Sequence, residues 1–557
     1  MLHIISFQIF FIFTFFVGRG LISVVKNYSR KSFSDNYIFL YTPIYLLYPV
    51  FGLFFIGNIN LLINFFSGVN NIFVYSTIGA FVLFFNIRNK LSILKNKLIN
   101  LNNFIITPGI IAISSLGIGF ARDAGGYHLN VQNWIRESKI VFGLYNLNPQ
   151  YGFSSIIDYI NSPFWINDSM ILQHYVNLTF VSVFLSFLFF HIKEKENGYL
   201  MTSSVLILAL GFLDNFGFNG GKNGFIEIDS VPKQDTAFAI VFYLASVSIF
   251  IAIKHSKFEN IELILISLLV LFTYQLRILG FTIFILFGFY LFLWYKKANS
   301  VLLVAKNLSL FFILNFFWFL KNTLLTGCVI FPLNISCFSI LNWYNKDLVL
   351  NERLSLANDW HKAYDVGDNV LTWFTLWSEN VINRTVAINF ISSFLILLFI
   401  CVLFGTRNDI QKSKITYVYF LFILMTFLIW LFTAPGIRLG IILFLLIINF
   451  ISVLLTINTD KGLGKLLNYK VLSISFYLVV VLLLPRLANF NMLKDNFLNF
   501  NQLNIEKVSY VSANDEEIYG VKPENKIACW VNLMCSAYNM QPVKVDGNFY
   551  SYFTVKK

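Results

Sequence analysis

Apolar residues fill the chain up to about position 490 in long blocks, and short polar segments separate the blocks. Most blocks have about 16–25 residues, the length that an α-helix needs to cross about 30 Å of hydrocarbon. Lipid offers no hydrogen-bond partner to a free backbone amide, so a spanning segment is either a helix or a strand of a closed barrel. The alternation of apolar and polar residues that is typical of barrel strands is missing from the sequence, so each block is expected to be a helix. Fourteen spans are predicted, near residues 3–25, 37–56, 71–87, 103–120, 170–190, 199–213, 236–253, 258–274, 278–295, 303–320, 386–404, 416–433, 439–457 and 471–487.

The composition supports a polytopic membrane protein of the all-α class. Of 557 residues, 57% are apolar and 12% are charged, and 65 are Phe. A water-soluble domain carries about a quarter charged residues, so a soluble enzyme, a disordered tail and a disulfide miniprotein are excluded. The first block has no basic segment before it and no cleavage site of small residues, so we interpret it as a span and not as a signal peptide.

The distribution of Lys and Arg predicts the orientation in the membrane, because these residues collect in short cytoplasmic loops. With Met1 outside, the predicted inside segments hold 20 Lys and Arg, against four in the short outside segments. The inside segments are 26–36, 87–102, 191–198, 254–259, 296–306, 405–414 and 458–470. Both termini are therefore expected outside. The net charge of +13 then reflects topology, and nucleic acid is not an expected partner.

Three long polar segments fall on the predicted outer side, at 121–169, 321–385 and 488–557. The cytoplasmic side has no comparable segment and no nucleotide-binding motif, so any chemistry is expected outside. An oxidising compartment would allow a disulfide between Cys328 and Cys337 or between Cys529 and Cys535. The second pair, in CWVNLMC, is the one that we expect more readily. No zinc site, no metal-binding residue and no cofactor is predicted, and the sequence leaves open whether a divalent metal is needed.

The first outside segment begins with RDAGGYHLNVQNW and contains the leading catalytic candidate, Asp123. A carboxylate at the membrane surface is costly unless it is solvated or functional, although Asp is also a favoured N-cap. The apolar positions that follow, from Tyr127 to Phe142, recur with helical spacing and predict an amphipathic helix in the interface. His128 would be either a second polar wall or an interfacial side chain.

Four further charged residues lie at predicted span ends on the outer face. Asp235 begins the seventh span, where it would act as an N-cap or as a second carboxylate of a site. Arg277 sits in a very tight turn, Arg438 follows the sequence TAPGI, and Lys321 closes the tenth span. Arginine can grip a phosphate with two donors, whereas snorkelling to the headgroups is the commoner fate of such a residue and the favoured interpretation for Lys321.

Together these motifs resemble the GT-C superfamily of membrane glycosyltransferases, and more closely a largely uncharacterised family of bacterial multi-spanning membrane proteins. The resemblance rests on RDAGGYHLNVQNW, DTAFA, FWFLKNTLLTGCVIFPL, Trp343, TAPGIR and CWVNLMC, spread over residues 120–557. It implies three regions, which are accessory spans at 1–102, a GT-C-like module at 103–487 and an extracytoplasmic segment at 488–557. It also implies a bacterial inner membrane location.

The resemblance further implies an inverting glycosyltransferase that moves a sugar from a polyprenyl-phosphate donor to an envelope glycan, lipid or protein. Asp123 would be the general base, Arg277, Arg438 and Lys321 the phosphate ligands, and Asp235, His128 and Tyr127 positioning residues. Trp343, Trp360, Trp373 and Trp377 would stack on acceptor sugars or form an interfacial aromatic belt. An envelope polysaccharide polymerase or ligase, and a transporter of lipid-linked glycans, are the alternatives.

Overall fold

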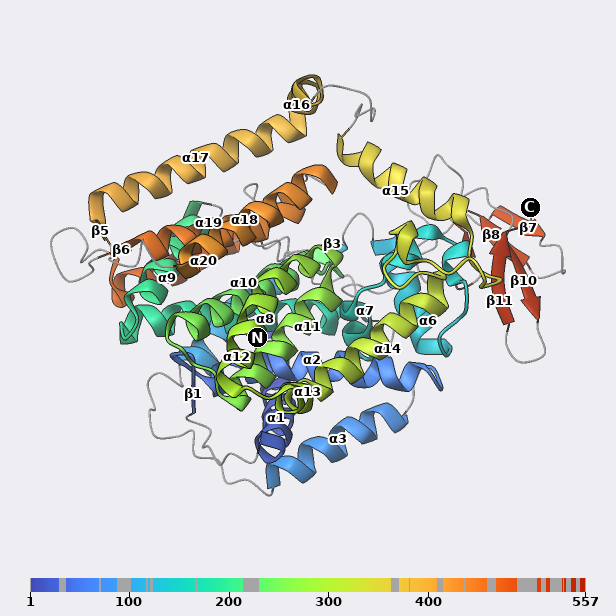
Figure 1. Cartoon of the computed structure of the whole chain (residues 1–557), viewed down its shortest axis with the longest axis horizontal. Coiled ribbons are helices and arrows are strands. Elements are labelled where there is room, and N and C mark those ends of the chain that lie inside the picture. The colour runs from blue at the N-terminus through green and yellow to red at the C-terminus, as the bar shows by residue number, and fades with distance from the viewer. Residues whose placement is uncertain are drawn as a thin grey trace.

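The chain folds into a bundle of apolar helices that carries small polar elements at its two ends (Figure 1). The computed structural model describes residues 2–29, 37–69, 72–87, 102–116, 119–120, 124–165, 169–213, 230–361, 370–379, 381–407, 414–433, 437–457 and 467–487, and parts of the tail. In the tail it describes residues 508–511, 517–520, 533, 535–536, 542–546 and 551–555. Seven helices within this part are long and apolar enough to cross a membrane.

The helices of the first half are α1 (Leu2–Ser29), α2 (Tyr48–Asn64), α3 (Ile72–Ile87), α5 (Thr107–Ile111), α6 (Leu129–Glu137), α7 (Ile156–Asn161), α8 (Ile171–Glu194), α9 (Gly198–Leu213) and α10 (Asp235–Lys254). The helices of the second half are α11 (Asn260–Leu276), α12 (Ile283–Ala298), α13 (Val301–Asn307), α14 (Ser309–Thr326), α15 (Lys346–His361), α16 (Val370–Glu379), α17 (Val381–Phe404), α18 (Lys414–Thr433), α19 (Ile437–Leu454) and α20 (Tyr469–Leu487). Helices α8 and α10 are buried almost throughout and form the centre of the bundle.

The described residues do not confirm fourteen continuous spans, and two of the predicted blocks are interrupted near their start or middle. The block predicted at 37–56 begins with a hairpin of β1 (Ile38–Phe39) and β2 (Thr42–Pro43), and its helix starts only at Tyr48 and runs to Asn64. The block predicted at 103–120 breaks into a π-helical turn, α5 and a 3-10 turn. Pro43 has no N–H to donate, so a helix cannot run through it from the residues before it. In the second block, Pro108 and Gly109 both have a low helix propensity.

The predicted outside segments lie together at one end of the bundle. Figure 1 shows α6, α15 and the hairpin of β10 (Pro542–Asp546) and β11 (Ser551–Val555) at that end, and β5 (Gly405–Arg407) with β6 (Leu455–Ile457) at the opposite end. Strand β7 (Val508–Val511) pairs with β8 (Glu517–Gly520), which also pairs with β9 (Cys535–Ser536).

A single amide joins all three outside segments. The Asn146 side chain donates to the carbonyl oxygens of Trp343 and Phe553, both at 2.8 Å. The backbone adds a bond from Phe553 N to Phe142 O at 3.0 Å, and one from Gly143 N to Leu324 O at 2.9 Å. Gly143 has a φ of +67°, and a Cβ there would lie 2.4 Å from the Phe553 oxygen. A glycine is therefore required where the tail docks.

The closest packing between long helices is that of α1 against α2. A Cβ on Gly18 would lie 1.8 Å from the Tyr48 carbonyl oxygen, and a Cβ on Gly52 would lie 2.1 Å from the Thr14 carbonyl oxygen. Small residues allow helix backbones to approach closely where lipid supplies no hydrophobic driving force between helices.

We expect Gly52→Ala to lower the free energy of unfolding by about 1–3 kcal/mol, because the added methyl overlaps a backbone oxygen that cannot rotate away. The measurement is the thermal transition of the purified protein in detergent. Gly288→Ala on α12 is the matched control, since a Cβ at that position meets nothing within 4 Å. Equal transition temperatures for the two variants would contradict the close contact.

Candidate functional site

An ion pair joins the adjacent ends of α10 and α11. The guanidinium of Arg277 donates to the carboxylate of Asp235, whose side chain is 3% exposed, against 17% for the Arg277 side chain. Arg277 follows the last residue of α11 in an extended conformation, and its backbone N–H still bonds to Thr273 O. The structure thus brings together two of the residues that the sequence singled out.

Asp235 is not the N-cap that the sequence suggested. The cap position belongs to Gln234, and Asp235 is the first helical residue of α10. A carboxylate in the first turn is stabilised by the helix dipole. Its additional contact with Arg277 means that the side chain does more than end a helix.

The segment that leads to Asp123 lies beside the segment that leads to Asp235. Strand β3 (Gly119–Phe120) pairs in parallel with β4 (Ser230–Val231), with Gly119 opposite Ser230 and Phe120 opposite Val231. Asp123 lies outside the described residues, between Phe120 and Ala124. The chain just before Asp123 is therefore placed beside the segment that leads into α10.

The predicted amphipathic helix is present but shorter than expected. It runs as α6 from Leu129 to Glu137, after a π-helical turn at Ala124–His128, and the predicted positions Val141 and Phe142 lie beyond its end. Its buried face packs on the protein, and the Asn64 amide donates to Ile135 O at 3.1 Å and to Ser138 O at 2.8 Å. These bonds satisfy carbonyls at the helix end.

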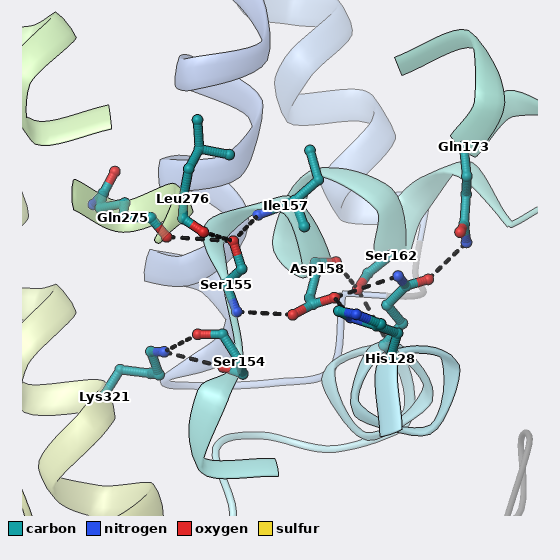
Figure 2. Close-up of polar contacts among 11 residues, drawn as sticks. His128, Ser154, Ser155, Ile157, Asp158, Ser162, Gln173, Gln275, Leu276 and Lys321 are labelled. Carbon is teal, nitrogen blue, oxygen red and sulfur yellow. Dashed lines mark hydrogen bonds and ion pairs between the residues drawn. The ribbon is translucent and has the colours of Figure 1, made fainter. Parts of the chain in front are cut away.

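His128 is a buried residue and not an interfacial side chain. Its Nδ1 lies 3.6 Å from Asp158 Oδ1, and the two side chains are 3% and 2% exposed. The Tyr127 ring lies against the imidazole, with 4.1 Å between ring centroids. Figure 2 shows the imidazole turned toward the Asp158 carboxylate.

Asp158 is the residue on which this polar group converges, and the sequence analysis did not identify it. Its Oδ2 accepts a bond from Ser155 N at 2.8 Å, and its Oδ1 accepts one from the Gln132 amide at 3.5 Å. The oxygen of the same Gln132 side-chain amide accepts a bond from the Gln173 amide nitrogen of α8 at 2.7 Å. The motif Ser155-Ile-Ile-Asp158 is a capping box, a signal present in the sequence.

Ser155 ties α7 to the end of α11. Its hydroxyl contacts Leu276 O at 2.8 Å and Gln275 O at 3.4 Å, immediately before Arg277. The Gln275 and Asn58 side-chain amides also exchange hydrogen bonds, at 2.9 and 3.1 Å. The backbone that carries Arg277 is therefore held from α7 and from α2.

Lys321 does not reach the headgroups, so the snorkelling interpretation is wrong. The side chain is fully buried, and its ammonium donates to the carbonyl and the hydroxyl of Ser154 at 3.2 and 3.1 Å. The Nζ atom lies 3.7 Å from the centroid of Trp318 and 5.9 Å from that of Tyr159. Burial, with a smaller effect of the charge on Asp158, raises the pKa of the Tyr159 phenol, which therefore remains neutral.

Of the two predicted cysteine pairs, the structure describes only the one that was expected less readily. Cys328 and Cys337 form a disulfide, with their Cα atoms 3.8 Å apart. Cys529, and the side chains of Cys535, Arg438, Trp360 and Trp373, lie outside the described part of the chain. Trp343 and Trp377 are both 5% exposed, and the indole N–H of Trp343 donates to Thr323 O at 3.1 Å. Neither side chain therefore offers an open face for a sugar in this conformation.

The comparison with protein families found one match. The model of a domain of unknown function (DUF8201) matches residues 1–445, and the chain belongs to that family. Comparisons with curated proteins and with solved structures found no match. Function therefore has to be argued from the residues themselves.

We expect Asp235→Asn to lower the free energy of unfolding by about 2 kcal/mol, because it leaves the Arg277 guanidinium partly buried without its carboxylate. Loss of the interaction with the helix dipole alone would cost only about 0.3–1 kcal/mol, so a role confined to the helix end predicts a smaller effect. Chemical denaturation in detergent measures the difference. The double variant Asp235→Asn/Arg277→Gln should lose less than the sum of the losses of Asp235→Asn and Arg277→Gln alone. A loss equal to that sum would exclude coupling between the two side chains.

Proposed function

We propose that this member of the DUF8201 family transfers a sugar from a polyprenyl-phosphate donor to an envelope glycan, lipid or protein acceptor. The reaction would take place at the outer face of a bacterial inner membrane, on a GT-C-like bundle with both termini outside. The observation that carries the proposal is the Arg277–Asp235 ion pair beside the two strands that lead to Asp123 and Asp235.

The arrangement of the outside segments supports an extracytoplasmic site. The segments that contain Asn146, Trp343 and Phe553 meet at one end of the bundle. The Cys328–Cys337 disulfide lies at the same end, and disulfides persist on the oxidising side of a membrane. The excess of Lys and Arg in the loops predicted to lie on the other side agrees with this orientation.

The chemistry that we propose is a single displacement at the anomeric carbon. The acceptor hydroxyl oxygen would attack that carbon while Asp123 takes its proton, and the bond from the carbon to the phosphate oxygen would break. The products are the glycoside and the polyprenyl phosphate, with inversion of configuration. A phosphate leaving group needs charge stabilisation more than protonation, and Arg277 and Arg438 would supply it.

The buried contacts suggest how the remaining residues would contribute. Asp235 would orient the Arg277 guanidinium, since an arginine held by a carboxylate loses less freedom when it binds a phosphate. Lys321 would act through the Ser154–Ser155 backbone, because two of its donors already bond to Ser154. His128 and Tyr127 would shape the segment after Asp123 through their contacts with each other and with Asp158.

We expect Asp123→Asn to reduce the release of polyprenyl phosphate by about 10²–10⁴-fold, because the base is lost while shape and capping ability remain. The assay incubates the purified protein, with membrane lipid and acceptor extract, with a panel of polyprenyl-phosphate sugars and follows the lipid product. Glu137→Gln is the matched control, since Glu137 is a carboxylate 45% exposed at the end of α6.

Three outcomes would contradict the proposal. If the Asp123→Asn variant released polyprenyl phosphate nearly as fast as the unchanged protein, Asp123 would not be the general base. Movement of a lipid-linked glycan across vesicles without bond formation would identify a transporter. Elongation of a lipid-linked polysaccharide that depends on Arg277 and not on Asp123 would instead identify a polymerase or ligase.

A further inference from the structure

The loop between α14 and α15 exposes an unusual set of large apolar side chains. Ile335 is 92% exposed and Ile340 is 86% exposed, and Leu333 and Phe338 are 44% and 47% exposed. The four residues lie within or just beyond the ring closed by the Cys328–Cys337 disulfide. Contiguous apolar exposure of this kind marks a surface that is covered in the working protein.

The sequence of this loop contains no charge that would keep it in water. Residues 322–345 include no Asp, Glu, Lys, Arg or His. Loops that face solvent usually carry charged and polar side chains, whereas this one places two of its most exposed positions on isoleucine. The absence of charge removes the main energetic cost of entering a membrane.

The backbone of the loop is also prepared for an apolar surrounding. Bonds run from Val329 N to Ser336 O at 2.9 Å and from Phe338 N to Gly327 O at 2.9 Å. The Ser336 hydroxyl bonds to Ile330 O, at 2.9 Å, and accepts from Ile330 N, at 3.0 Å. Pro332 has no N–H to satisfy. Lipid tolerates an irregular backbone only where its polar groups have partners.

The loop continues from a surface that faces lipid if α14 spans the membrane. The exposed side chains of α14 include Phe312, Ile313 and Phe316, at 53%, 53% and 61%. The helix ends at Thr326, and Gly327, with a φ of +78°, turns the chain directly into the loop. Large apolar side chains are therefore exposed both on the first half of α14 and in the loop that follows it.

The base of the loop is held firmly by the protein. The Tyr145 hydroxyl accepts from Asn345 N and donates to Asn345 O, and the Tyr344 hydroxyl donates to the Asn334 amide oxygen. Cys328 itself is fully buried. The apolar tip therefore projects from a fixed support, so that little freedom is lost when it enters another phase.

We propose that the tip formed by Leu333, Ile335, Phe338 and Ile340 inserts into the outer leaflet, at the boundary between headgroups and acyl chains. The partner is the lipid surface, and the binding energy comes from the apolar area removed from water. The disulfide places the tip on the oxidising side. The proposal depends on the membrane location of α14 and not on the glycosyl transfer proposed above.

Photo-crosslinking of the full chain in its own membrane tests the proposal. A benzophenone amino acid is introduced at Ile335, at Ile340 and, as a control, at Asp347, which is exposed on the first turn of α15. After irradiation, mass spectrometry of the purified protein identifies the attached species. The exposed positions tolerate the substitution, and a second labelled position guards against a local folding defect at the first.

We expect phospholipid adducts at positions 335 and 340 to exceed those at Asp347 by roughly tenfold, because only a side chain below the headgroups contacts acyl chains. A crosslink to a second copy of the chain, or to another protein, would overturn the proposal and identify that molecule as the occupant. Lipid adducts no more frequent than at Asp347 would also overturn it, since the tip would then lie in water.

Discussion

A charge that is buried at the end of an apolar helix needs an opposite charge or several hydrogen bonds, and this constraint organises the end of the bundle that is predicted to lie outside, here called the outer end. Arg277 is a charged residue between the apolar helices α11 and α12, and the Asp235 carboxylate beside it compensates its charge. The guanidinium is left partly exposed at 17% while the carboxylate is 3% exposed. The pair therefore joins two helices, and the guanidinium is its more exposed member.

The same constraint explains the buried polar group around α7. Asp158 is met by a backbone N–H, an amide and an imidazole, and the Lys321 ammonium is met by Ser154 and by the face of Trp318. Ser155 lies between them and bonds to the carbonyls that precede Arg277. Hydrogen bonds thus run without a break from Lys321 and Asp158 to the backbone next to Arg277.

The outer end combines two kinds of surface. One is polar and internally bonded, with Asn146 joining the first segment to Trp343 and to the tail at Phe553. The other is the apolar tip of the disulfide loop, held by Tyr145 from the same segment. The glycosyl transfer proposed above would use both kinds of surface, one for the polar reacting group and one for the membrane from which the substrate would arrive.

The sequence by itself determined the membrane class and the position of most helices, because length and apolar composition are local properties. It also identified Arg277 and Asp235 as unusual. It misplaced the start of α2 and joined the broken segment around Pro108, since apolar content does not reveal where a helix breaks. Only the tertiary structure decided that Lys321 is buried on Ser154, that Cys328 pairs with Cys337, and that Asp158 lies beside His128. These outcomes depend on which distant segments pack together, and such contacts leave no periodic trace in the chain.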